Sequence, residues 1–244
     1  MTVWSDNFDD NVLDLNKWQK TEAFTGTGYG GSYERNQRIE LEAQVTDGYG
    51  GATIGIVSRD RYDLTKGKVS IYLRSKELYK VCLCISPQKT TGDPDTQLSD
   101  VYGIWLANGE FVVLKKIGGE SDTPYRQPWI AGSNVVRIEI EAGFIRFYEG
   151  DICRYYEPYQ LPSYECYIYI YGWGGTEIPG AVWTGIDWAD DFYCEYCGTA
   201  EEKQEAQTLI VQQKISEFLK ANWIPLSVLA VVLAIVISLV LGLW

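Results

Sequence analysis

Apolar and polar residues alternate along much of residues 1–198. The clearest runs are Lys68–Arg74, Val136–Glu141 and Cys166–Tyr171. A period of two is typical of strands, because successive side chains of a strand point to opposite faces of the sheet. Asn108-Gly109, which lies between two further runs, predicts a tight hairpin turn. The pattern predicts an all-β, two-sheet antiparallel sandwich, with loops at the glycine-rich stretches 26–31, 48–51 and 172–175.

The pattern changes after residue 198. Thr199-Ala200-Glu201-Glu202 has the form of a helix-capping box, with a hydroxyl N-cap and Glu at the third helical position. Apolar residues then recur at near-helical spacing: Leu209, Ile210, Ile215, Phe218 and Leu219. We expect an amphipathic stalk helix over residues 199–222. Its apolar stripe would pack either on the β domain or on other copies of the chain, which would make the protein a homo-oligomer.

The last twenty-one residues, Ile224–Trp244, contain no charged side chain. A helix of this length extends about 30 Å, which matches the hydrocarbon core of a bilayer. Residues 223–244 are therefore predicted to form a C-terminal transmembrane helix, bracketed by Trp223 and Trp244 as an aromatic belt. The β domain would then be tethered to a lipid bilayer and exposed on a cell or virion surface. The charges beside the span leave the side of the membrane open.

Composition narrows the function further. The formal net charge is -12, and so acidic a chain is a poor partner for nucleic acid. There is no histidine, which excludes Ser-His and Cys-His dyads and removes the commonest zinc ligand. The six cysteines are an even number, which favours disulfides, and a cross-link between Cys153 and Cys166 would close a local loop.

The two ends of the β domain carry a resemblance. Residues 4–18 read WSDNFDDNVLDLNKW, and residues 185–193 read GIDWADDFY. They resemble the opening and closing strands of the concanavalin A-like lectin/glucanase superfamily. That resemblance implies a jelly-roll sandwich over residues 1–198, with its first and last strands side by side. Trp4, Phe8 and Trp18 are large apolar residues, and we expect them to seal one edge of the sandwich against Trp188 and Phe192. Members often hold a structural calcium near these ends, for which Asp6, Asn7 and Asp187 are the candidate ligands here.

The glucanase members carry an E-[IL]-D-x-x-E type of strand, whose carboxylates share one face and act as nucleophile and acid/base. In this sequence Glu40 and Glu42 share a face, and so do Glu139 and Glu141. Neither pair has the third acid or the expected place in the middle of the sheet. The sequence therefore predicts a domain without catalytic activity.

Aromatic residues suggest a binding surface instead. Tyr167, Tyr169, Tyr171 and Trp173 recur at every second position and so share one face of a strand. Flat rings with hydroxyls suit the C–H faces and hydroxyls of sugars, so this row is a candidate carbohydrate platform, with Trp105 as an addition. The same row could instead be packed core. Asp95 and Asp100, in the polar stretch 90–100, could orient a sugar hydroxyl.

These features favour a membrane-anchored surface recognition protein that binds a glycan or glycoprotein on a cell surface, such as a virion attachment or spike protein. The combination is similar in style to membrane proteins of archaeal viruses. One alternative is a structural protein that uses the same fold for subunit packing in a viral coat or cell envelope. A second alternative is a GH16-like glycanase.

Overall fold

The computed structural model describes residues 2–130, 134–176, 178, 181–196 and 212. It divides the chain into two units, residues 1–200 and 201–244, and the description below concerns the first. The described part contains fourteen strands and one short helix: β1 (Thr2–Asp6), β2 (Trp18–Glu34), β3 (Ile39–Ser58), β4 (Tyr62–Asp63), β5 (Lys68–Arg74), β6 (Lys80–Ser86), α1 (Pro94–Gln97), β7 (Val101–Ala107), β8 (Glu110–Ile117), β9 (Glu120–Pro128), β10 (Val135–Glu141), β11 (Phe144–Glu149), β12 (Ile152–Pro158), β13 (Glu165–Thr176) and β14 (Trp183–Tyr196).

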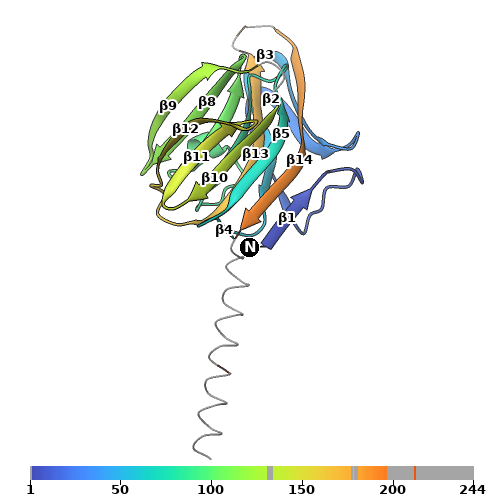
Figure 1. The fold of residues 1–244 in the computed structure, drawn as a ribbon. Coiled ribbons are helices and arrows are strands. Elements are labelled where there is room, and N and C mark those ends of the chain that lie inside the picture. Colours follow the sequence, from blue (N-terminus) through green and yellow to red (C-terminus); the bar gives the residue numbers. More distant parts are fainter. Residues whose placement is uncertain (1, 131–133, 177, 179–180, 197–211, 213–244) are drawn as a thin grey trace, which may run out of the picture. The chain divides into compact units, whose positions relative to one another are not determined.

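The long strand β3 connects the two layers of the sandwich (Figure 1). Its first part, Ile39–Val45, pairs with β14, and its second part, Gly50–Val57, pairs with β13. One layer therefore runs β12-β11-β10-β5-β14-β3, and the other runs β3-β13-β6-β7-β8-β9. We call the second layer the cleft sheet and the first the opposite sheet. All pairings within them are antiparallel, as the alternation predicted.

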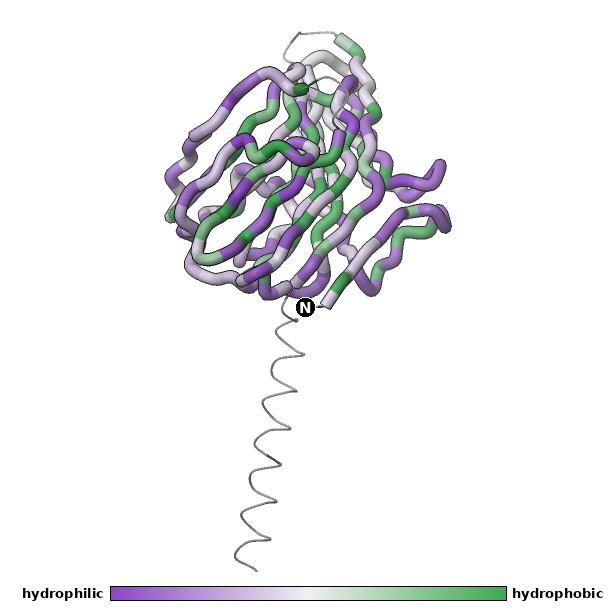
Figure 2. The backbone as a smooth tube through the Cα atoms, in the orientation of Figure 1, coloured by the Kyte–Doolittle hydropathy of each residue, from purple (hydrophilic) through white to green (hydrophobic). Residues whose placement is uncertain are grey.

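The inward side chains of both layers form one apolar core. Alternation places Ile71 and Leu73 of β5, and Leu83 and Ile85 of β6, in the same cluster. Figure 2 shows hydrophobic and hydrophilic residues alternating along the strands. The layers also meet through rings, since Tyr102 of β7 lies 5.8 Å from Phe147 of β11 between ring centroids. Burial of these faces stabilises the sandwich by about 25 cal/mol per Å² of apolar surface.

The chain ends of the domain confirm the predicted neighbours. β1 pairs antiparallel with β14, with Trp4 opposite Cys194. Trp4 packs on Trp18 and Phe192, with centroid distances of 4.8 and 4.7 Å. Trp188 is not part of this cluster: it stacks on Tyr72 at 5.2 Å on the outer face of the opposite sheet. The alternation along β14 explains the difference, because Trp188 lies between the buried residues Asp187 and Ala189 and so points outward.

The prediction of loops at the glycine-rich stretches is wrong. All three stretches lie within strands β2, β3 and β13, and residues 50–52 pair with residues 174–176. Glycine is needed there because the sheet is closely covered. A Cβ on Gly174 would lie 2.2 Å from the Trp183 ring, and one on Gly51 would lie 3.2 Å from the Trp173 indole. Others approach backbone instead: a Cβ on Gly26 would lie 1.8 Å from the Tyr49 carbonyl oxygen. The glycines therefore allow close approach of rings and of neighbouring strands.

The cysteines give a second correction. Cys82, Cys84, Cys166 and Cys194 are buried and free, and Cys153 is exposed and free. The predicted cross-link between Cys153 and Cys166 is therefore not formed. Cys166 lies instead beside the Tyr159 hydroxyl, 3.5 Å from its oxygen.

The predicted stalk helix, residues 199–222, and the predicted transmembrane helix, residues 223–244, lie outside the described residues, apart from residue 212. Within the described residues, no helix has the length and apolar character needed to cross a bilayer.

Candidate functional site

A polar segment crosses the outer face of the cleft sheet. We call residues 87–100, which connect β6 to β7 and contain α1, the strap. At one side the strap is bound to β2, where the Glu22 N–H donates to the Thr91 carbonyl at 2.8 Å. At the other side it is bound to β8 and its following turn, where Lys116 Nζ donates to the Asp95 carbonyl at 3.1 Å. The side chain of Leu98, almost fully buried, packs between strap and sheet. The strap is therefore fixed at both of its sides, to β2 and to β8.

The strap covers most of the predicted tyrosine platform. Tyr167, Tyr169, Tyr171 and Trp173 do share one face of β13, as predicted, while Ile168 and Ile170 face the core. Tyr169 and Tyr171, however, are completely buried beneath the strap. Tyr167 is half-buried, with Lys89 Nζ 5.0 Å from its ring centroid. Of the predicted platform, only Trp173 and the added Trp105 line an open space.

That open space is a cleft of about 450 Å³ beside the strap. Its floor is formed by outward residues of β13, β6, β7 and β8, one wall by the strap, and its rim by Tyr79 and the turn between β7 and β8. The lining residues are Tyr79, Lys80, Asp93, Asp95, Thr96, Trp105, Ala107, Asn108, Glu110, Val112, Arg126 and Trp173. Tyr79 is 54% exposed and packs edge-to-face on Trp173, with 5.3 Å between ring centroids.

The Asp95 carboxylate is held in this cleft by a hydrogen bond and an ion pair. Tyr171 donates its hydroxyl proton to Asp95 Oδ1 at 2.5 Å, and Lys80 Nζ pairs with Asp95 Oδ2. Lys80 also lies over the Trp105 ring, 4.0 Å from the centroid. Burial acts to lower the pKa of Lys80, but the acidic groups beside it, among them Asp95, raise the pKa overall. Trp105 Nε1 is buried and has no hydrogen-bond partner among the described residues.

Two further carboxyl groups line the cleft. Asp93 is the N-cap of α1, and its side chain accepts from the Asp95 N–H at 3.0 Å. Burial, and then the nearby Asp95 carboxylate, raise the pKa of Asp93. Glu110 lies across the cleft at the start of β8, with its Oε2 3.6 Å from Arg126 Nε. These two carboxyl groups therefore differ in their surroundings: burial raises the pKa of Asp93, whereas Glu110 is paired with a cation.

The outward face of β7 carries no acidic side chain. The outward positions of β7 are Val101, Gly103 and Trp105, whereas Tyr102, Ile104 and Leu106 point into the core. β7 is therefore not the acid-bearing strand that the glucanase resemblance implies. The carboxyl groups of the cleft come from the strap and from β8.

The carboxylates that the sequence suggested lie elsewhere. Glu40 and Glu42 do share a face, on the outer side of the opposite sheet, where Arg35 pairs with both; its Nη2 lies 2.9 Å from Glu42. Glu139 and Glu141 are also on that sheet, with Glu139 3.6 Å from Arg137 and Glu141 3.4 Å from Arg146. These pairs are charged surface networks remote from the cleft.

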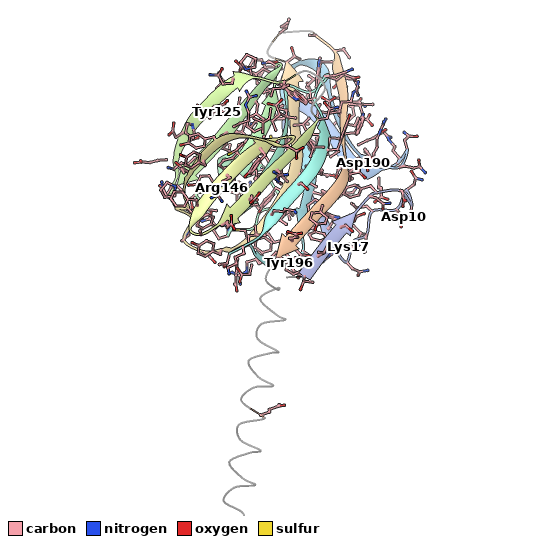
Figure 3. All side chains as sticks on the ribbon, in the orientation of Figure 1. Asp10, Lys17, Tyr125, Arg146, Asp190 and Tyr196 are labelled. Atoms are coloured by element: carbon pink, nitrogen blue, oxygen red, sulfur yellow. The ribbon has the colours of Figure 1, made fainter. Side chains whose placement is uncertain are left out.

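The predicted calcium ligands are not brought together. Asp6 lies opposite Phe192 in the sheet, whereas Asp187 lies opposite Leu41, five residues away along β14, or roughly 15 Å. Asp6 accepts from the Trp18 indole N–H at 2.9 Å, and Asn7 donates to Asp9 in the loop after β1, which Figure 3 marks with Asp10. Among the described residues, no group of three or more acidic or cysteine side chains could hold a metal ion. The residues present do not fit a shared calcium site.

Asp187 has a different role. Its carboxylate is completely buried and accepts from the N–H groups of Lys76, Glu77 and Leu78 at 2.8–2.9 Å. Burial raises the pKa of Asp187, and these three N–H groups counteract the increase. The carboxylate thereby fixes the turn between β5 and β6, which places Tyr79 and Lys80 at the cleft.

Several solved structures with a similar arrangement of strands are glucanases. The catalytic domain of an endo-1,3-β-glucanase (laminarinase) from Thermotoga petrophila RKU-1 is 14% identical, with a TM-score of 0.56 over 80% of this chain and 97% of that one. LamAcat from Zobellia galactanivorans is 12% identical, with a TM-score of 0.55 over 79% and 96%. The β-glucanase of Bacillus licheniformis is 13% identical, with a TM-score of 0.52 over 80% and 98%. No family model matches the sequence, and no curated protein matches it significantly.

These likenesses show the concanavalin A-like jelly-roll fold, and they confirm that part of the sequence prediction. They also contradict the prediction of a domain without catalytic activity, because the structures with a similar fold include a laminarinase and β-glucanases. At 12–14% identity the likeness extends to the fold, and the reaction has to be argued from this chain's own residues.

Sequence reasoning missed Lys80, Asp93 and Glu110, and it assigned Asp95 only a general role in a loop. A signal was present for Asp93: Asp93-Pro94 places an N-cap residue before a proline at the first helical position. Asp100, the other acid proposed for sugar binding, accepts from the Gly118 N–H at 2.9 Å and so holds the end of the strap.

Proposed function

We propose that this domain binds a glycan in the cleft beside the strap. The observation that carries the proposal is the combination of aromatic rings and carboxyl groups in that cleft: Tyr79 at the rim, Trp105 and Trp173 on the floor, and Asp95 on the wall. Such rings stack on the C–H faces of a sugar, while the carboxylate accepts from its hydroxyls. A neighbouring structure of the same fold, a LamA variant, holds laminaritriose and laminaritetraose.

The proposal is tested with an array of soluble oligosaccharides and isothermal titration. Tyr79→Ala and Trp173→Ala should each weaken binding about tenfold or more, as expected when a stacking ring is removed. Tyr156→Ala is the matched control, because Tyr156 is also an exposed tyrosine, at 65% against 54% for Tyr79, and lies on β12 of the opposite sheet. Equal loss in Tyr79→Ala and Tyr156→Ala, or binding unaffected by either cleft variant, would contradict the placement of the site.

A second candidate function is hydrolysis of the bound glycan. It is favoured by the three carboxyl groups in the cleft and by the glycanases that share the fold. Glycoside hydrolysis needs one carboxyl that donates a proton and a second that is ionised. Asp93, whose pKa is raised by burial, suits the donor, and Glu110, paired with Arg126, suits the ionised partner.

Release of reducing ends from β-glucans and mucin-type glycans tests this candidate. Asp93→Asn and Glu110→Gln should each lower turnover by at least about a hundredfold, whereas Glu40→Gln, on the opposite sheet, should leave it unchanged. Turnover that survives in both cleft variants would remove these carboxyl groups from the reaction.

We propose further that residues 223–244 anchor the domain in a bilayer and that residues 199–222 join copies of the chain, so that the cleft is displayed on a cell or virion surface. The support is the uncharged stretch Ile224–Trp244 and the capping box at Thr199. The full chain should float with liposomes and elute as an oligomer in detergent, and a chain ending at residue 198 should do neither. A full chain that stays in the lipid-free fraction would disprove the anchor. A stable oligomer without glycan binding would favour the structural role in a coat or envelope.

A further inference from the structure

The buried tyrosines of β13 are not accessible to a ligand, but the hydroxyl of each one is hydrogen-bonded to the strap. Tyr169 accepts from the Thr90 N–H and donates to the Gln88 carbonyl, both at 2.9 Å. Tyr171 donates to the Asp95 carboxylate at 2.5 Å. Both rings are completely buried. The first tyrosine therefore holds strap backbone, and the second holds a side chain that lines the cleft.

We propose that Tyr171 and Lys80 are positioning residues for Asp95, and that they fix this carboxylate as the ligand-facing acceptor on the cleft wall. This inference rests on the proposed glycan binding at the same cleft. Tyr169 and Tyr171 then hold the strap in place and do not form a surface on which sugars stack.

The geometry supports this assignment in two ways. Tyr171 takes Asp95 Oδ1 and Lys80 takes Oδ2, so each oxygen is held once from the floor. An ionised carboxylate has about four lone-pair sites, so acceptor capacity remains for a ligand hydroxyl. The Asp95 side chain is 21% exposed, whereas Lys80 is 12% exposed and stays over the Trp105 ring. Asp95 is therefore the most exposed member of this trio.

Preorganisation is the physical benefit. A carboxylate on a polar loop would otherwise lose side-chain and backbone freedom when a ligand binds, at a cost to affinity. Here the strap backbone at Asp95 is held by Lys116, and its carboxylate is held by Tyr171 and Lys80 before any ligand arrives. A fixed acceptor can discriminate between sugars by the position of one hydroxyl.

The chain offers a matched pair of variants. Tyr171→Phe and Tyr169→Phe each remove one buried hydroxyl from the same strand and keep the ring. Tyr171→Phe should raise hydrogen exchange at the Gln97 and Leu98 amides, which close α1 onto Asp93 and Pro94, and should weaken glycan binding about tenfold. Tyr169→Phe should raise exchange at Thr90 and leave affinity within about twofold. Lys80→Met, which keeps the aliphatic stem over Trp105, should behave like Tyr171→Phe and serves as the second variant if Tyr171→Phe does not fold.

The outcomes separate this inference from the function on which it rests. If the wild-type chain binds no glycan, the proposed function fails, while the exchange maps still report whether Tyr171 orders the strap around Asp95. If Tyr171→Phe and Tyr169→Phe have the same exchange map and the same affinity, the positioning role is overturned. Weaker binding in Tyr169→Phe than in Tyr171→Phe would overturn it as well.

Discussion

Asp187 is the buried charge on which the shape of the cleft rim depends. It points inward from β14, where Gly185 and Ala189 are its inward neighbours, and it is completely buried. Three consecutive N–H groups of the turn after β5, those of residues 76–78, donate to it. Arg74 Nη1 adds a charge 3.7 Å from Oδ1. We predict that replacing this carboxylate is among the most destabilising single changes on β14.

The magnitude follows from the donors left behind. Hydrogen bonds to a charged group contribute about 1.5–3 kcal/mol each, and a buried donor left unpaired costs about 1–3 kcal/mol. Leu78 is buried, so its N–H cannot turn to water, whereas Lys76 and Glu77 are exposed residues whose N–H groups regain part of their solvation. Asp187→Ala should therefore cost about 3–5 kcal/mol, against a total stability of about 5–15 kcal/mol for a domain. Asp187→Asn keeps one oxygen acceptor and should cost about half as much.

Urea unfolding followed by tryptophan fluorescence measures both variants, with an unchanged m value as the test that the same two states are compared. Asp151→Ala is the control, since the Asp151 side chain is fully exposed. The turn also carries Tyr79 and Lys80 to the cleft, so Asp187→Ala should weaken glycan binding even where the domain remains folded. A loss of stability below about 1 kcal/mol in Asp187→Ala, or one equal to that of Asp151→Ala, would refute the reasoning.

Three further predictions follow from burial. Burial, a hydrogen bond with Asp10 and the charges of Asp10 and Asp6 raise the pKa of Glu34 from its usual 4.5 to about 7. The pKa of Glu34 is higher in the folded state than in the unfolded state, so protonated Glu34 stabilises the fold. This contribution to the free energy of unfolding is complete below about pH 4.5, is lost as the pH rises through about 7, and amounts to at most about 3 kcal/mol. Glu34→Gln should flatten this dependence between pH 5 and 8 in urea midpoints, and an unchanged slope would contradict it. Gly174→Ala should destabilise by about 1–3 kcal/mol because its Cβ would meet the Trp183 ring at 2.2 Å, and Gly51→Ala, with 3.2 Å to the nearest ring atom, should cost less in the same assay. A maleimide mapped by mass spectrometry should label Cys153 quickly and Cys84 only on unfolding, and rapid labelling of Cys84 would show that the strap opens.

The regular part of the fold could be predicted from local pattern. Strands such as β5 and β10 follow from alternation because one face of each is buried. The pairing of β1 with β14 follows from the resemblance of residues 4–18 and 185–193 to the opening and closing strands of the concanavalin A-like superfamily. The glycines of β13 could not be assigned this way, because their composition is that of turns. What makes them strand residues is the Trp183 ring on Gly174, a contact between distant parts of the sequence.

The candidate glycan-binding cleft depends even more on contacts between distant parts of the sequence. The alternation correctly placed Tyr169 and Tyr171 on one outer face, but nothing in the polar sequence of residues 87–100 indicates that it folds back over that face. Asp187 carries a local signal in the sequence, because it lies at an inward position of a strand. A carboxylate at an inward strand position has to be paired or hydrogen-bonded, so its place in the alternation argued against a surface metal ligand.

The strap also accounts for the absence of acids on β7. Its cover reaches the outward positions next to Cys84 and Tyr169, where β7 presents Gly103, whose Cβ would lie 2.3 Å from the Cys84 sulfur. A carboxylate at such a position would be buried beneath the strap, where Lys80 is already paired with Asp95, and an unpaired buried charge costs several kcal/mol. The strap therefore disfavours a carboxylate at the position of Gly103. The carboxyl groups that line the described cleft come instead from the strap and the start of β8, where Asp93 and Glu110 lie.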